Sequence, residues 1–217
     1  MDMMAIRRRV MLVNLKKSRL PEEYQEVEYI ASSGTQYIDT GYVPSLSTKT
    51  RVIASFPDNS VTCMCGAVSS STGYDIAGWG SSAAKWFMRA FTSSTVRTTA
   101  AKNAWGYSSG FHVFETDAAN HYMSVDGIGE TRTAQPASNF SIRIYLFARR
   151  NNNGNLEYAG NGCVIKEAIF TESDAEVRHF IPCYRKSDSE IGMYDLVGKQ
   201  FYANSGTGVF SKGNDVN

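Results

Sequence analysis

The stretch Ala119-Asn-His-Tyr-Met-Ser-Val-Asp-Gly-Ile128 decides the fold class of this chain, because it has the pattern of a β-hairpin. Its residues alternate in polarity up to Val125, as expected of a half-buried strand. Asp126-Gly127 follows, and this dipeptide suits the positive φ angles of a tight two-residue turn. The sequence therefore predicts two antiparallel strands joined at this turn.

From residue 26 onward, the sequence has the pattern of short β-strands separated by turns. Short runs rich in Val, Ile, Thr, Tyr and Phe alternate with clusters of Gly, Ser, Asn and Asp. A dozen strands at this spacing require two packed sheets or a barrel, and 217 residues suit one large β-sandwich. The predicted strands cover residues 26–31, 36–40, 48–56, 62–69, 74–79, 85–90, 96–99, 111–116, 121–125, 128–133, 142–149 and 162–171, with a further pair in 193–202.

Two local features refine this prediction. A capping box formed by Ser173 and Glu176 predicts one short helix within residues 171–180. Residues 29–38 and 201–210 echo one another, with an aromatic residue, alanine, Ser-Gly-Thr and two closing apolar residues in each. Both segments read as strand, tight turn, strand. We expect these first and last hairpins to lie side by side.

The N-terminal residues 1–20 differ from the rest of the chain in charge. They hold six basic residues and one acid, whereas the remainder holds 16 basic and 20 acidic residues. Residues 1–20 are predicted to be a basic arm or a short amphipathic helix that contacts a partner, and 21–217 to be the sandwich. A solvated, frayed terminus is the alternative. The residues expected to dock are Arg7, Arg8, Arg9, Lys16 and Lys17.

The total composition excludes several kinds of partner. A net charge of +1 gives no global attraction to nucleic acid or to an anionic membrane. The sequence shows neither a signal peptide nor a run of about 18 apolar residues that could span a membrane. The four cysteines lack the paired short spacings of zinc modules, so we expect small core residues in a protein made in a reducing cytoplasm.

Several motifs resemble a known family. They are Phe111-His-Val-Phe, His121-Tyr-Met-Ser-Val-Asp-Gly127 and Gly160-Asn-Gly-Cys-Val-Ile-Lys-Glu-Ala-Ile-Phe170, with the flanks Leu20-Pro-Glu-Glu-Tyr-Gln-Glu-Val-Glu-Tyr-Ile30 and Phe180-Ile-Pro-Cys-Tyr-Arg185. Over residues 20–213 the chain resembles laminin-G-like domains of the concanavalin A type, in particular small proteins encoded by phages and prophages of gut bacteria. The resemblance implies an antiparallel two-sheet jelly roll.

The functional expectation follows from this resemblance. It implies a non-enzymatic virion component of the fibre, tail or head-decoration type, made in the host cytoplasm. The arm would contact other virion proteins, and the sandwich would bind bacterial or mucosal glycans. Analogy with such particle proteins suggests a homotrimer. A purely structural or protein-binding module without glycan contact is one alternative, and a bacterial carbohydrate-binding surface protein is another.

Catalysis is disfavoured by the carboxylate pattern. Retaining glycosidases place two carboxylates about 5 Å apart. Glu115 and Asp117 are the nearest candidates, but the retaining glucanase pattern would want a third carboxylate where this chain has Ala118, Ala119 and Asn120. We therefore expect no enzyme activity.

Sugar and calcium binding have candidate residues in the loops. Aromatic faces stack on sugar rings, and asparagine pairs with hydroxyl groups. These features predict a ligand site at Trp79, Trp105, Tyr107 and Asn152, although one or two of the tryptophans could instead be buried. Calcium is a cofactor of many laminin-G-like domains, and Asp75 and Asp126 are eligible ligands by type.

Overall fold

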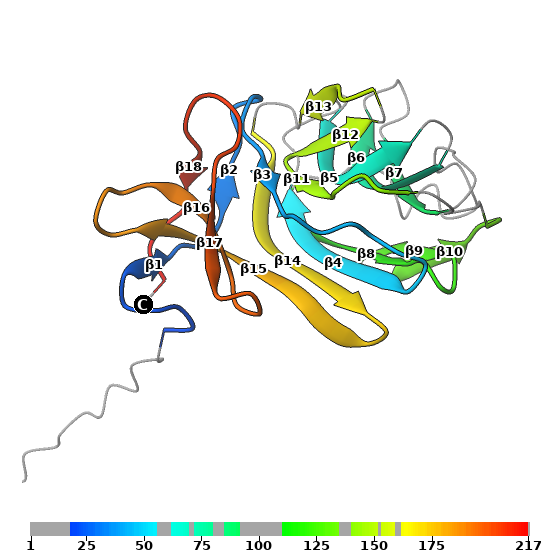
Figure 1. The fold of residues 1–217 in the computed structure, drawn as a ribbon, viewed down its shortest axis with the longest axis horizontal. Helices are drawn as coiled ribbons and strands as arrows, with labels where there is room; N and C mark the ends of the chain where they lie inside the picture. The colour runs from blue at the N-terminus through cyan, green and yellow to red at the C-terminus, as the bar shows by residue number, and fades with distance from the viewer. Residues whose placement is uncertain are drawn as a thin grey trace, which may run out of the picture.

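A computed structural model gives the fold and describes residues 18–55, 62–69, 72–79, 85–91, 110–134, 140–151, 153–158 and 162–216. Within these ranges the regular elements are all β-strands, arranged in two sheets that pack as a β-sandwich (Figure 1). The predicted all-β, two-sheet fold is confirmed. Residues 1–17, for which the sequence predicts an arm or a helix, lie outside the described part of the chain, as does the strand predicted at 96–99.

The larger sheet contains eleven strands. They are β1 (Tyr24–Glu26), β2 (Ile30–Ala31), β4 (Thr48–Ser55), β8 (His112–Asp117), β9 (Tyr122–Val125), β10 (Ile128–Thr131), β14 (Val164–Glu172), β15 (Ala175–Arg185), β16 (Ile191–Asp195), β17 (Gln200–Ala203) and β18 (Ser211–Lys212). The main order is β10-β9-β8-β4-β14-β15-β16-β17, with β1 beside β15 and β2 between β14 and β18. All of these pairs are antiparallel.

The smaller sheet contains seven strands. They are β3 (Ile38–Asp39), β5 (Thr62–Ser69), β6 (Thr72–Trp79), β7 (Lys85–Ala90), β11 (Tyr145–Leu146), β12 (Ala148–Asn151) and β13 (Leu156–Tyr158). β12 runs parallel to β5, which departs from the predicted wholly antiparallel pattern. The cause lies at Phe147, whose φ of 63° reverses the chain between β11 and β12, where the sequence predicts one strand.

The core lies between the two sheets. Along β4, buried and half-buried residues alternate, so that Val52 and Ala54 point inward. They join Phe114 and Phe170 from neighbouring strands in one cluster with Tyr74 of the smaller sheet. Burial of each such aromatic side chain contributes about 1.5–3 kcal/mol, which makes this layer the main source of stability.

Two predictions of local structure are confirmed. β9 and β10 form the expected hairpin, with φ angles of 51° at Asp126 and 77° at Gly127. The two echo segments lie side by side, because the amide of Ser205 donates to the carbonyl of Tyr37 at 2.9 Å. A segment near the start of the chain therefore contacts a segment near its end. The prediction that each is a hairpin is wrong, because β2 and β3 belong to different sheets, and β17 and β18 pair with β16 and β2 rather than with each other.

The helix predicted within residues 171–180 is wrong. β14 and β15 form an antiparallel hairpin there, with a two-residue turn at Ser173 and Asp174, whose φ angles are 49° and 69°. The hairpin buries Phe170 and Phe180 in the core from neighbouring strands. Burial of these aromatic residues therefore prevails over the local capping signal.

The molecule is elongated, and both ends of its described chain lie at the same end of the long axis. Figure 1 shows β1, β18 and the C-terminus together at the left, where Val27, the residue after β1, forms an isolated antiparallel bridge with Asp215. β6, β7, β12 and β13 lie in the opposite half of the picture. The fold therefore separates the described chain ends from β6, which carries Asp75 and Trp79.

Candidate functional site

A row of cross-strand neighbours crosses the smaller sheet. Arg89 in β7 is paired with Asp75 in β6, Asp75 with Gly66 in β5, Gly66 with Arg149 in β12, and Arg149 with Glu157 in β13. Directly paired residues share one face of a sheet. We call these five residues the arginine–aspartate row.

The arginine–aspartate row faces away from the core. Tyr74 and Met88, which precede Asp75 and Arg89 in their strands, belong to the buried cluster between the sheets. Successive side chains of a strand point to opposite faces. Asp75 and Arg89 therefore lie on the outer face of the smaller sheet.

Direct ion pairs connect the charged members of the row. Arg89 binds Asp75 in a bidentate way, with Nε donating to Oδ1 at 2.8 Å and the second nitrogen to Oδ2 at 2.7 Å. Arg149 donates to the same Oδ2 at 2.6 Å and, through Nε, to Glu157 at 2.6 Å. Asp75 thus joins two guanidinium groups that come from different strands.

Two glycines make room for this arrangement. A Cβ atom on Gly66 would lie 2.3 Å from Cβ of Asp75, and one on Gly73 would lie 2.7 Å from the guanidinium carbon of Arg89. Any larger residue would displace the ion pairs. Glycine inside a strand often marks such a close approach, and this signal is present in the sequence.

Solvent reaches the row from one side. The exposed fraction of the side chain is 0% for Asp75, 6% for Arg89, 20% for Arg149 and 47% for Glu157. Burial acts to lower the pKa of Arg149, but the electrostatic effects of Cys63 and Asp75 and the hydrogen bonds to Asp75 and Glu157 outweigh it, and the pKa is raised. The hydrogen bonds of the row hold its polar groups in place before any ligand arrives.

One of the four predicted ligand residues, Trp79, lies in a described strand of the same sheet as this row. Trp79 is the last residue of β6, four positions after Asp75, and its backbone pairs with Lys85. Asn152 directly follows β12, although it lies outside the described residues, as do Trp105 and Tyr107.

The two calcium candidates do not form a common site. Asp75 belongs to the smaller sheet, where it binds two arginines, whereas Asp126 occupies the β9–β10 turn of the larger sheet. The carboxylate of Asp126 accepts from the amide of Val113 at 2.8 Å and contacts Nδ1 of His112 at 2.6 Å. Across the described ranges, no group of three or more His, Cys, Asp or Glu residues is arranged to hold a metal ion.

The carboxylates considered for catalysis lie on the other sheet. Glu115 and Asp117 are in β8, on the outer face of the larger sheet. Burial acts to raise the pKa of Asp117, but hydrogen bonds from Asn120 and the charge of Lys49 outweigh it, and the pKa is lowered. A general acid needs a raised pKa. Asp117 is therefore suited to hold charge rather than to donate a proton.

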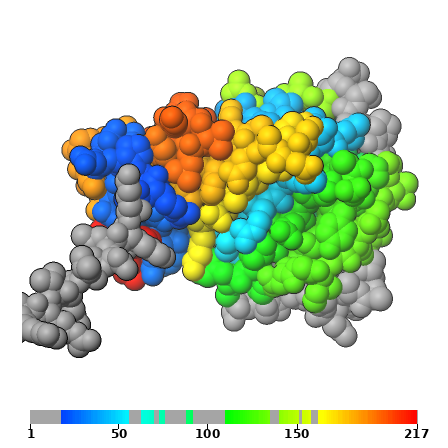
Figure 2. Space-filling view, turned by 90° about the horizontal axis from the view of Figure 1, so that it is seen from below, coloured from blue at the N-terminus to red at the C-terminus, as the bar shows by residue number. Residues whose placement is uncertain are grey.

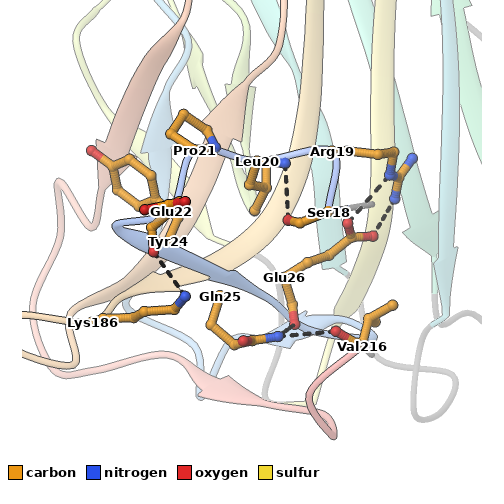
Figure 3. A pocket seen from close by; sticks show the side chains of 10 residues that line it. All are labelled: Ser18, Arg19, Leu20, Pro21, Glu22, Tyr24, Gln25, Glu26, Lys186 and Val216. Carbon is orange, nitrogen blue, oxygen red and sulfur yellow. Dashed lines mark hydrogen bonds and ion pairs between the residues drawn. The ribbon is translucent and has the colours of Figure 1, made fainter. Parts of the chain in front are cut away.

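A groove of about 710 Å³ lies where the chain enters the sandwich (Figure 3). Leu20 is buried beneath it, Lys186 donates to the carbonyl of Glu22 at 2.8 Å, and Gln25 donates to the carbonyl of Val216 at 3.0 Å. Both ends of the described chain thus line the groove. Its lining residues are Ser18, Arg19, Leu20, Pro21, Glu22, Tyr24, Gln25, Glu26, Lys186 and Val216.

The residues predicted to dock a partner, at positions 7–9 and 16–17, lie outside the described part of the chain. The first described residue, Ser18, lines the groove (Figure 3). Comparison with protein-family models and with curated proteins finds no match for this chain. Among the described residues, no helix has the length and apolar character needed to cross a membrane.

Proposed function

We propose that this protein is a non-enzymatic component of a phage or prophage particle, of the fibre, tail or head-decoration type. Its N-terminal arm attaches it to other virion proteins, and the outer face of the smaller sheet binds glycans. One observation carries the proposal: the groove at the chain entry lies at one end of the long axis, and the arginine–aspartate row lies toward the other (Figure 1). An attached protein would therefore present the row outward.

The chemistry of the row supports glycan binding. Sugar hydroxyl groups pair with fixed donors and acceptors, and Arg149 and Glu157 offer both at the solvent-exposed side of the row. Their positions are held by the buried pair of Asp75 and Arg89. Trp79, the last residue of β6, is of a residue type on which sugar rings stack.

Two experiments test the two halves of the proposal. In the first, a variant of the full chain with glutamine at positions 7, 8, 9, 16 and 17 is compared with the native chain for incorporation into particles. We expect the variant to be lost from particles, and equal incorporation would remove the role of the arm. In the second, the native chain and Arg149→Met are compared for binding to bacterial and mucosal glycans.

A protein-binding or structural module without glycan contact is the second candidate. It is favoured by the ion pairs within the row, because Asp75 is saturated by two arginines and its side chain is fully buried. Buried pairs of this kind also hold strands in register. If the native chain binds no glycan but is still incorporated into particles, this second candidate is supported.

A further inference from the structure

Three pairs in the sequence place an asparagine or an aspartate directly before a glycine. They are Asp126-Gly127, Asn153-Gly154 and Asn161-Gly162. In such a pair the backbone nitrogen of the glycine can attack Cγ of the preceding side chain, because the glycine has no side chain that hinders the approach. The structure holds the three pairs in different ways, so we expect their reactivity to differ.

The backbone nitrogen of Gly154 is available for this attack. Asn153, Gly154 and Asn155 lie exposed in the turn between β12 and β13. Among the residues that the structure describes, none accepts a hydrogen bond from the amide of Gly154. A Cβ atom on Gly154 would meet only Nη2 of Arg150 in this part of the chain, at 3.5 Å. The turn therefore has room for the movement that ring closure requires.

The backbone nitrogen of Gly162, in contrast, is held by a hydrogen bond. Its N–H donates to the carbonyl of Ser32 at 2.7 Å, just before the chain enters β14 beside β2. To attack Asn161, this nitrogen would have to give up its partner, which costs free energy. The folded protein is therefore expected to slow the reaction at Asn161, although the local sequence is the same Asn-Gly pair.

Asp126-Gly127 is protected by the ionisation of its side chain. The pair forms the exposed turn of the β9–β10 hairpin, among the green strands at the right of Figure 2. Burial acts to raise the pKa of Asp126, but hydrogen bonds from His112 and from the amide of Val113 outweigh it, and the pKa is lowered. An ionised carboxylate is a poor electrophile, so Asp126 reacts slowly near neutral pH.

We propose that Asn153 is a site of spontaneous deamidation in the folded protein. The nitrogen of Gly154 gives its proton to a base of the solvent and bonds to Cγ of Asn153, which closes a succinimide ring, and the side-chain nitrogen leaves as ammonia. Water then opens the ring at either carbonyl group and leaves aspartate or isoaspartate. Water is thus consumed and ammonia is released. The inference goes beyond the proposed function and does not depend on it.

Deamidation adds a negative charge to the hairpin that carries the exposed end of the arginine–aspartate row. A carboxylate replaces a neutral amide, which lowers the net charge of the chain from +1 to zero. The new charge belongs to the turn that joins β12, which holds Arg149, to β13, which holds Glu157. Isoaspartate also adds a methylene group to the backbone of this turn. The native chain is therefore converted over time into a more acidic form.

Peptide mapping by mass spectrometry tests the inference on the full chain, incubated at mildly alkaline pH in the folded state and in denaturant. In denaturant, Asn153 and Asn161 both precede a glycine and should convert at similar rates. In the folded chain we expect Asn153 to convert several-fold faster than Asn161. Digestion in heavy-oxygen water marks any conversion that arises during handling. No conversion of Asn153 in the folded chain, or conversion of Asn161 at least as fast, would overturn the inference.

Two matched variants in the same turn sharpen this test. Asn153→Gln keeps the amide and the net charge, but a glutamine side chain closes a larger ring much more slowly. Asn155→Gln changes an asparagine that precedes Leu156 rather than a glycine. Native isoelectric focusing should show the acidic form accumulating in the native chain and in Asn155→Gln, and strongly reduced in Asn153→Gln. Circular dichroism confirms that both variants are folded. Accumulation at the native rate in Asn153→Gln would contradict the inference.

Discussion

Replacing Gly66 with alanine tests whether the arginine–aspartate row depends on close contact between β5 and β6. The new Cβ atom would lie 2.3 Å from Cβ and 2.8 Å from Cα of Asp75. Neither atom is the end of a flexible side chain, so the two strands must move apart. Overpacking of this kind costs about 1–3 kcal/mol. Weakening the charge-assisted hydrogen bond from Arg149 to Asp75 costs about 1.5–3 kcal/mol more.

The substitution also offsets part of this loss, because glycine inside a strand is about 0.5–1 kcal/mol less favourable than alanine. We therefore expect Gly66→Ala to lower the free energy of unfolding by about 2–4 kcal/mol. Urea unfolding followed by circular dichroism measures this change. The control Ser69→Ala, in the same strand, is expected to change it by less than about 0.5 kcal/mol.

A double-mutant cycle identifies the contact that is lost. Arg149→Met is measured in the native and in the Gly66→Ala background, and we expect a coupling of about 1 kcal/mol or more, because both changes remove the same ion pair. A loss below about 0.5 kcal/mol for Gly66→Ala, or additive effects, would refute the reasoning.

Three further predictions concern other parts of the fold. Burial acts to raise the pKa of Glu172, but hydrogen bonds from neighbouring hydroxyl groups outweigh it and lower the pKa below its ordinary value of 4.5. The ionised carboxylate therefore stabilises the fold above about pH 4.5, and this stabilisation is lost as the pH falls through the folded-state pKa. Glu172→Gln should flatten this part of the curve of unfolding free energy against pH. Ser173→Gly should raise the free energy of unfolding by about 0.5 kcal/mol, because Ser173 has a φ of 49°, and an unchanged or lower melting temperature would contradict this. Burial raises the pKa of Cys183 to about 12, and all four thiols are buried, so a thiol reagent should modify them only after denaturation.

The strands and hairpins of the sandwich were predictable where a local signal sets them. Asp126-Gly127 favours positive φ angles, so its hairpin was readable from the sequence. The shared motif of the echo segments indicated their contact, but not that the strands flanking each turn pair with other strands. β15 was not predicted, because Pro182 interrupts the strand pattern and the capping box at Ser173 imitates a helix start. Burial of Phe180 in the core, which no local signal reports, decided the outcome.

The candidate site was only partly predictable. The sequence singled out Asp75, as a calcium candidate, but not its ion pairs with Arg89 and Arg149, because these depend on the register between strands of the sheet. Gly66 was the available signal, since a glycine inside a strand marks close approach. That Asp75 is the residue opposite Gly66 depends on the register between β5 and β6.

The measurement that tests the central claim most directly is tryptophan fluorescence of the full chain, titrated with bacterial and mucosal glycans with and without calcium. The account predicts a saturable change for at least one glycan, strongly reduced in Arg149→Met and retained in Ser69→Ala. If the folded native chain gives no response to any glycan, or if Arg149→Met responds as the native chain does, the outer face of the smaller sheet is not a glycan site.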